Sequence, residues 1–199
     1  MIFGKAHGLH DFTAQEQRES SRLLGPVYES DLDGHRITTF IERLERADQR
    51  QWLVQYWLYE FNMQTKRYPE AIHATEQMIV IAPNDPRSTY AIAEMFRLLT
   101  HAIWTLPEIA NLVPAMYANM RNAGLDDDLI DPDASLAGLQ ALDLSVEGAY
   151  YRAIYFYEHT LKRKLQRADR QQIERSMTLL QGSVGRFLAS ARQHPDTIG

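Results

Sequence analysis

The chain contains no cysteine among its 199 residues. This absence excludes disulfides, thiolate metal sites, iron–sulfur clusters and a cysteine nucleophile. No apolar run approaches the length of about 18 residues that a membrane-spanning helix requires. The N-terminal residues also lack the apolar core of a signal peptide. We therefore expect a cytoplasmic protein that does not enter a membrane.

Glycine is missing between Gly34 and Gly124. A sheet-rich protein would need glycine in turns throughout such a stretch. Pro69, Pro86 and Pro107 each stand at the start of an apolar periodic segment, which is typical of the first position of a helix. The fold class predicted from these placements is all-α.

The apolar periodicity predicts eight or nine helices in a single domain of residues 1–199. The short connections favour antiparallel helical hairpins. Residues 1–34 form an N-terminal arm with a short helix, and residues 124–134 form an acidic loop. Helices are expected over about 13–24, 35–45, 48–67, 69–81, 86–104, 107–123, 135–143, 145–161 and 169–188.

Two helix starts carry a specific signal. Thr13 and Glu16 have the spacing of a capping box, and Asp85 precedes Pro86 as an N-cap residue would. The helix over 48–67 is apolar on more than one face, because it carries both Trp52 and Trp57 among other aromatic residues. We predict that it is the most buried helix of the domain.

Residues 52–85 span 34 positions, which is the period of the tetratricopeptide repeat. The segment resembles one such repeat at five positions, namely Leu58, Tyr68, Glu70, Ala71 and Pro83. It departs from the pattern at three positions: Tyr59 replaces a small residue, Lys66 replaces the usual glycine, and Met78 replaces alanine. A second copy fails because Pro107 falls inside its second helix.

The resemblance implies a helical hairpin whose first helix lines a partner-binding concave side. The partner-facing candidates that it implies are Tyr56, Glu60, Met63 and Gln64. Trp52 and Trp57 lie on the same helix, and only one of its faces can point outward. Sequence alone does not decide whether that face carries the two tryptophans or the four candidates.

Charge is unevenly distributed along this chain of net charge −5. Between residues 160 and 192, eight basic residues stand against two acidic ones. Residues 126–133 are strongly acidic and include an apolar pair, Leu129 and Ile130. The aspartates of that loop are Asp126, Asp127, Asp128, Asp131 and Asp133. The acidic loop would attract a basic partner, and the basic segment would attract an acidic partner. Sequence alone does not decide which of the two is the contact surface.

Metal and cofactor motifs are weak. Asp127 to Asp131 spells the DDxxD pattern of magnesium–pyrophosphate sites, but it lies in a loop between Gly124 and Pro132 rather than on a helix. No phosphate-binding loop, nucleophile elbow or HExxH pattern occurs. We therefore expect no metal, no cofactor and no catalytic residues.

The predicted function is a protein–protein interaction module that acts as an adaptor or as a specific inhibitor similar to bacterial immunity proteins. Two alternatives remain: a structural subunit of a bacterial or phage assembly, and a helical-bundle enzyme without a recognisable motif. The expected partner is a protein, and a basic one if the acidic loop is the contact. The net negative charge of the chain disfavours nucleic acid as a partner, and a homo-oligomer remains an alternative.

Overall fold

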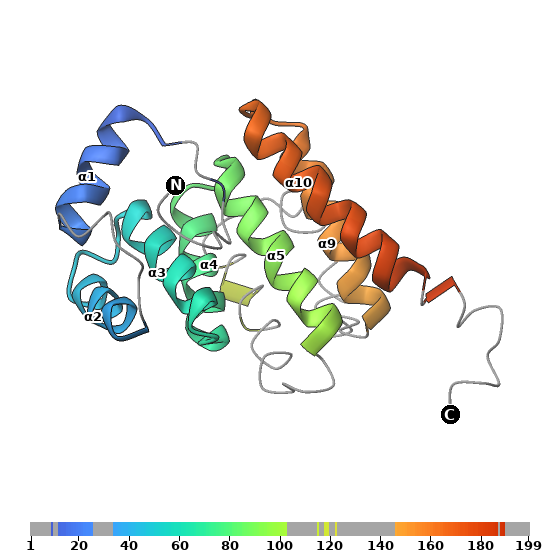
Figure 1. Ribbon diagram of the computed structural model, residues 1–199, viewed down its shortest axis with the longest axis horizontal. Helices are drawn as coiled ribbons and strands as arrows, with labels where there is room; N and C mark the ends of the chain where they lie inside the picture. Colours follow the sequence, from blue (N-terminus) through green and yellow to red (C-terminus); the bar gives the residue numbers. More distant parts are fainter. Residues whose placement is uncertain are drawn as a thin grey trace.

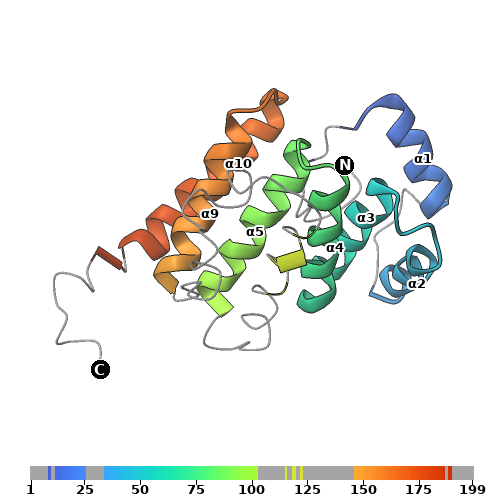
Figure 2. The same cartoon turned by 180° about the vertical axis from the view of Figure 1, so that it is seen from behind.

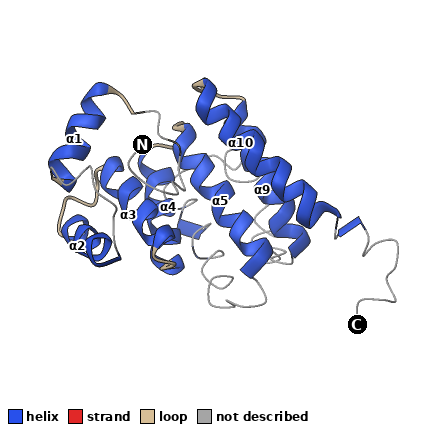
Figure 3. Ribbon diagram, viewed as in Figure 1, coloured by secondary structure: helices blue, strands red, loops and turns tan. Residues whose placement is uncertain are grey.

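A computed structural model describes Leu9 and residues 12–25, 34–102, 115, 118, 119, 122, 146–186, 188 and 189. Within these residues all regular structure is helical, and no strand occurs (Figure 3). The helices, labelled as in Figure 1, are α1 (Ala14–Leu24), α2 (Gly34–Glu45), α3 (Trp52–Gln64), α4 (Tyr68–Ile81), α5 (Pro86–Ala102), α9 (Val146–Leu161) and α10 (Arg167–Leu180). The predicted all-α class is confirmed.

The described helices follow one another in space in nearly the order of the sequence. The pairs with the most extensive contact are α1–α2, α2–α3, α3–α4, α4–α5, α5–α9 and α9–α10. Helix α1 also reaches α3, and Trp52 at the start of α3 donates a hydrogen bond to Ser88 of α5. Figures 1 and 2 show the resulting row, with α1 and α2 at one end and α9 and α10 at the other. Each helix is therefore stabilised mainly by its neighbours along the chain, as in repeat proteins.

The predicted helix starts at Thr13 and Asp85 are both present. The Thr13 hydroxyl accepts a hydrogen bond from the Glu16 amide at 3.2 Å, while the Thr13 amide donates to the Glu16 carboxylate at 2.8 Å. At the start of α5, the Arg87 amide donates to Asp85 Oδ1 at 2.8 Å. These side chains satisfy amides that the first turn of a helix leaves unpaired.

Helix α3 is buried along almost its whole length, as its sequence predicts. Every residue from Leu53 to Met63 is buried. Trp57 is 1% exposed, and its indole nitrogen donates to the Ser20 hydroxyl at 3.0 Å. The indole is thus a core side chain that also fastens α1 to α3, with its polar atom satisfied as burial requires.

Several helix boundaries differ from the expected ones. Helix α3 runs from Trp52 to Gln64 rather than over 48–67, and the residues before it form a turn in which Arg50 Nε donates to Asp48 Oδ1 at 3.1 Å. Helix α10 begins at Arg167, two residues before the expected start at Asp169.

Seven α-helices are described, against the eight or nine expected. Of the helix expected over 107–123, the structure describes four residues, all helical. The helix expected over 135–143 lies outside the described residues. None of the described helices has the length and apolarity that crossing a membrane would require.

The last helix widens at its C-terminal end. Residues Gln181–Gly185 form a π-helical turn directly after α10. A side chain at Gly185 would bring its Cβ to 3.0 Å from the Tyr150 hydroxyl, so glycine permits the close approach of α9. Single π-turns of this kind are rare in proteins.

The connection between α3 and α4 is a Schellman motif centred on Lys66. The Arg67 amide donates to the Asn62 carbonyl at 2.9 Å, and the Lys66 amide donates to the Met63 carbonyl at 3.3 Å. Lys66 has φ of 60°, in the left-handed region that favours glycine. The side chain of Lys66 is exposed, so nothing in the packing requires it there.

We expect Lys66→Gly to raise the free energy of unfolding by about 1 kcal/mol, because it removes the steric cost of a left-handed non-glycine residue. Thr65→Gly is the matched control, since Thr65 has an ordinary φ of −90° and its hydroxyl donates to the Phe61 carbonyl. That variant should lose stability. Urea denaturation followed by far-ultraviolet circular dichroism measures both, and a destabilised Lys66→Gly protein would contradict the expectation.

Candidate functional site

The side chains that the repeat resemblance implies as partner-facing do not form an exposed surface. Tyr56, Glu60 and Met63 are 0%, 1% and 5% exposed, and Gln64 is half-buried. Their helix, α3, is apolar on all sides and is covered by its neighbours, which leaves it no outward face. Tyr56 and Glu60 bond to each other, with the hydroxyl donating to Oε1 at 3.2 Å.

The acidic loop cannot be placed beside them. All of residues 126–133 lie outside the described residues. The interaction predicted for Asp126, Asp127, Asp128, Leu129, Asp131 and Asp133 therefore stays a prediction.

A buried guanidinium lies next to Tyr56. Arg87 is 8% exposed, and its Nη2 contacts Asp85 at 2.6 Å and Glu16 at 2.8 Å. The same guanidinium stacks over the Trp52 ring at 4.1 Å. Burial alone would raise the pKa of Glu16, but its hydrogen bonds with Arg87 and with the Thr13 amide outweigh burial and lower that pKa. The charged pair is thus the stable form at neutral pH.

A second buried ionic group joins α5 to α9. Glu94 is 3% exposed, accepts from Arg97 Nη2 at 2.7 Å, and accepts a short hydrogen bond from the Tyr157 hydroxyl. Burial first, and then the nearby carboxylate of Glu94, raise the pKa of Tyr157. The phenol therefore keeps its proton and acts as a hydrogen-bond donor, so this cluster provides a fixed polar contact between the two helices.

A small apolar cavity lies between α3, α4 and α5. Its volume is about 10 Å³, which leaves room for about one water molecule. It is lined by Tyr59, Met63, Tyr68, Ala71, Ile72, Thr75, Met95 and Leu98. Met63, predicted to face a partner, instead faces this space, which is too small for a cofactor or a metabolite.

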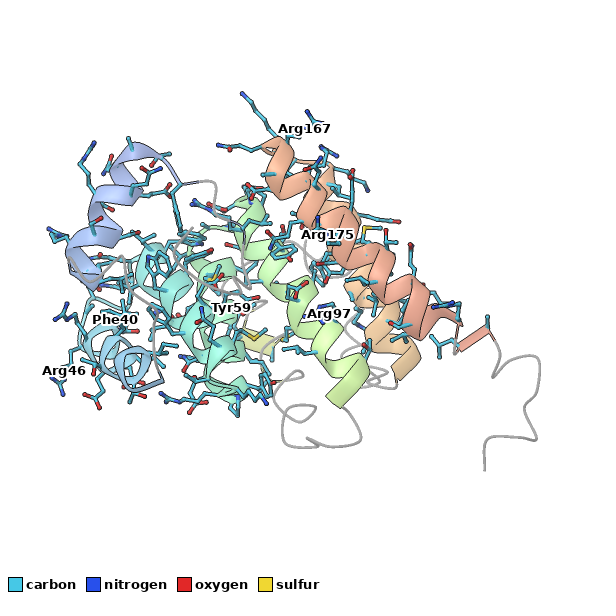
Figure 4. The ribbon with its side chains drawn as sticks, in the orientation of Figure 1. Phe40, Arg46, Tyr59, Arg97, Arg167 and Arg175 are labelled. Carbon is cyan, nitrogen blue, oxygen red and sulfur yellow. The ribbon has the colours of Figure 1, made fainter. Side chains whose placement is uncertain are left out.

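The outer surface of α10 carries exposed cations. Arg167, Gln171, Arg175 and Leu179 are all exposed and follow one another at four-residue spacing along one face. Leu179 is 67% exposed, which makes it the most exposed large apolar residue in the described part of the chain. Figure 4 shows Arg167 at the first turn of α10, at the periphery of the molecule, with Arg175 further along the same helix.

The turn that precedes α10 adds to this charge. Lys162 and Lys164 are exposed, and among the described residues neither they nor Arg167 and Arg175 form an ion pair. Arg170 differs, since its guanidinium donates to the Leu161 carbonyl at 3.0 Å and closes the end of α9. We call the surface formed by Lys162, Lys164, Arg167, Gln171, Arg175 and Leu179 the α10 face.

His159 lies in the last turn of α9 and contacts Arg163. Arg163 Nη2 donates to His159 Nε2 at 3.2 Å, which requires a neutral imidazole. Burial, followed by the positive charges of Arg163 and Lys162, lowers the pKa of His159 below its ordinary value.

Comparison with known proteins gives no relative for this chain: no family model, no curated protein and no solved structure matches it. The candidate sites therefore stand on their geometry alone.

The sequence interpretation missed both buried ionic groups. Glu94 follows Ala91 by three positions and precedes Leu98 by four, so it lies on the apolar stripe of α5. A charged residue inside an apolar stripe is a signal that could have identified it. Arg87 offers less of a signal, because its partner Glu16 is 71 residues away in the sequence.

We expect Tyr157→Phe to lower the free energy of unfolding by about 1–3 kcal/mol, because the change leaves a buried oxygen of Glu94 without its donor. Tyr151→Phe is the matched control on the same helix, since Tyr151 is 51% exposed. It should change stability by less than about 0.5 kcal/mol. Equal effects of the two changes in chemical denaturation would contradict the role assigned to the Glu94–Tyr157 contact.

The lowered pKa of His159 predicts a loss of stability in mild acid. Below its ordinary pKa of 6.5 the unfolded chain binds a proton that the folded protein does not, so stability falls as the pH falls through this value. The melting temperature of the wild type, measured relative to that of His159→Gln, should therefore fall from pH 8 to pH 5. A difference that is constant across this range would contradict the assignment.

Proposed function

We propose that the protein is a cytoplasmic protein–protein interaction module that binds an acidic partner through the α10 face. The single observation that carries this proposal is the row formed by Arg167, Gln171, Arg175 and Leu179, in which exposed cations end at an exposed leucine. Protein interfaces commonly combine an apolar anchor with arginine, and arginine binds carboxylates in a bidentate manner.

The charge of the α10 face determines the chemistry of the partner. Glu174 is the one exposed acidic side chain between residues 162 and 179, because Asp169 is buried. An acidic segment with one apolar side chain would complement both the cations and Leu179. Nucleic acid is a poorer fit, because the chain as a whole has a net charge of −5.

The architecture that presents this face is proposed to be a short array of antiparallel helical hairpins, of which α3 and α4 form one of tetratricopeptide type. Two features support the proposal. Helices contact chiefly their neighbours along the chain, and Lys66 takes the left-handed conformation at the position where the repeat pattern has glycine. Such arrays present extended surfaces and serve as adaptors or inhibitors.

The proposal is tested by site-specific photo-crosslinking in the cell that produces the protein. A photoreactive residue replaces Gln171 on the α10 face or, as the matched control, the exposed Gln15 on α1. We expect a discrete adduct from position 171 only, and mass spectrometry should locate it in an acidic segment of the captured protein. Equal adducts from the two positions would contradict the proposal.

Charge reversal tests the same contact without a crosslinker. Arg167→Glu with Arg175→Glu should slow association with the captured protein by about tenfold at low salt, because steering depends on long-range attraction. Arg18→Glu with Arg22→Glu places the same change on exposed positions of α1 and should have little effect. All four positions are exposed, so stability should stay within about 0.5 kcal/mol.

A further inference from the structure

Leu9 and Phe12, which precede α1 in the sequence, contact side chains of α3. The Leu9 carbonyl accepts a hydrogen bond from the Tyr56 hydroxyl at 2.8 Å. The Phe12 ring meets Tyr56 edge-on with centroids 5.1 Å apart and stacks on Trp57 at 5.7 Å. The two residues thus contribute a main-chain oxygen and an aromatic anchor to side chains of α3.

Helix α1 continues this attachment along a single stripe. Its contacts recur every fourth residue after Phe12: Glu16 pairs with Arg87, Ser20 accepts from Trp57, and Leu24 is buried. Most of its other side chains are exposed and polar. Helix α1 makes only sparse contacts with α2 and α3, and its 11 residues are too few for a stable helix in isolation. Figure 1 shows α1 at the end of the row of helices.

The surface beneath this segment is held in place by contacts that do not involve it. Asp85 binds the Arg87 guanidinium through Nε at 2.9 Å and Nη2 at 2.6 Å, and Trp52 supports its face. Trp52 itself donates to the Ser88 hydroxyl at 2.9 Å. The Tyr56 hydroxyl also contacts Glu60. Because these contacts do not involve α1, the side chains of Arg87, Trp52 and Tyr56 should keep their positions when α1 leaves.

We propose that this surface is a helix-recognition site, occupied in cis by Leu9, Phe12 and α1, which accepts a helix of the same pattern from a partner protein when α1 is displaced. The pattern is an aromatic residue, a carboxylate, a small hydroxyl residue and a leucine at four-residue spacing. The aromatic residue meets Tyr56 and Trp57, and the carboxylate meets Arg87. The inference does not depend on the α10 face or its partner.

Helix α1 and a partner helix would compete for the same site. A segment tethered to its own site has an effective concentration of about millimolar order, so a partner helix must bind tightly or α1 must be loosened first. Loosening α1 should therefore raise the apparent affinity for a helix supplied in trans.

The test uses a fluorescein-labelled peptide of residues 9–25 as the probe and the full-length chain as the receptor. In the receptor, Phe12→Ala with Glu16→Gln weakens the occupant and leaves Tyr56, Trp57 and Arg87 unchanged. Fluorescence anisotropy should show that this variant binds the probe about tenfold or more tightly than the wild type does. A probe that carries the same two changes is the matched control and should not bind.

Adding Arg87→Gln to the loosened receptor should abolish binding, because the carboxylate of the probe loses its partner. A loosened receptor that melts cooperatively and yet fails to bind the probe overturns the proposal. A receptor that instead forms a dimer by exchanging α1 between two copies supports it, because the site then holds a helix supplied in trans.

Hydrogen exchange on the wild-type chain tests the proposal without any substitution. The amides of α1 should exchange through a local opening, at rates at least about tenfold above those of α3. Protection of α1 equal to that of α3 would mean that α1 leaves its site only on global unfolding, and this result would overturn the proposal even if the loosened variant did not fold.

Discussion

A guanidinium that is withdrawn from water needs more acceptors and more packing than a single helix can supply. Arg87 obtains them from three parts of the chain: Asp85 in the turn before α5, Trp52 at the start of α3, and Glu16 on α1. Asp85 still pairs with the guanidinium when Glu16 is removed, whereas the loss of both carboxylates would leave a buried charge uncompensated, which is costly. Arg87 therefore links α1, α3 and the start of α5 through one buried group.

The Glu94–Arg97–Tyr157 cluster has the same role further along the row of helices. The helices are also joined by apolar packing, such as the stacked rings of Phe96 and Phe156, whose centroids lie 5.9 Å apart. Apolar packing tolerates a shift of one helix along another more readily than a hydrogen-bonded charge does. We infer that the two buried carboxylate–arginine groups fix how the helices are aligned, while the apolar residues supply most of the favourable free energy.

Local signals in the sequence predicted the local structure well. The capping box at Thr13 and the N-cap at Asp85 depend on residues a few positions apart, and both are present in the structure. The surface of the protein was harder to predict. Glu60 on α3 belongs to a residue type that is usually exposed, yet it is 1% exposed and its carboxylate accepts a hydrogen bond from Tyr56. No periodicity reveals that a distant segment will cover a helix, and the cation row of α10 was predicted only as a net excess of charge.

Within the described residues, no substantial contact closes the row of helices on itself. Its first members, α1 and α2, and its last, α9 and α10, share no substantial contact in the described part of the chain. Two macromolecules bound at these two ends would be held apart by α3, α4 and α5, which lie between them. A molecule built in this way has the geometry of a spacer, whose length is fixed by the number of helices in its middle.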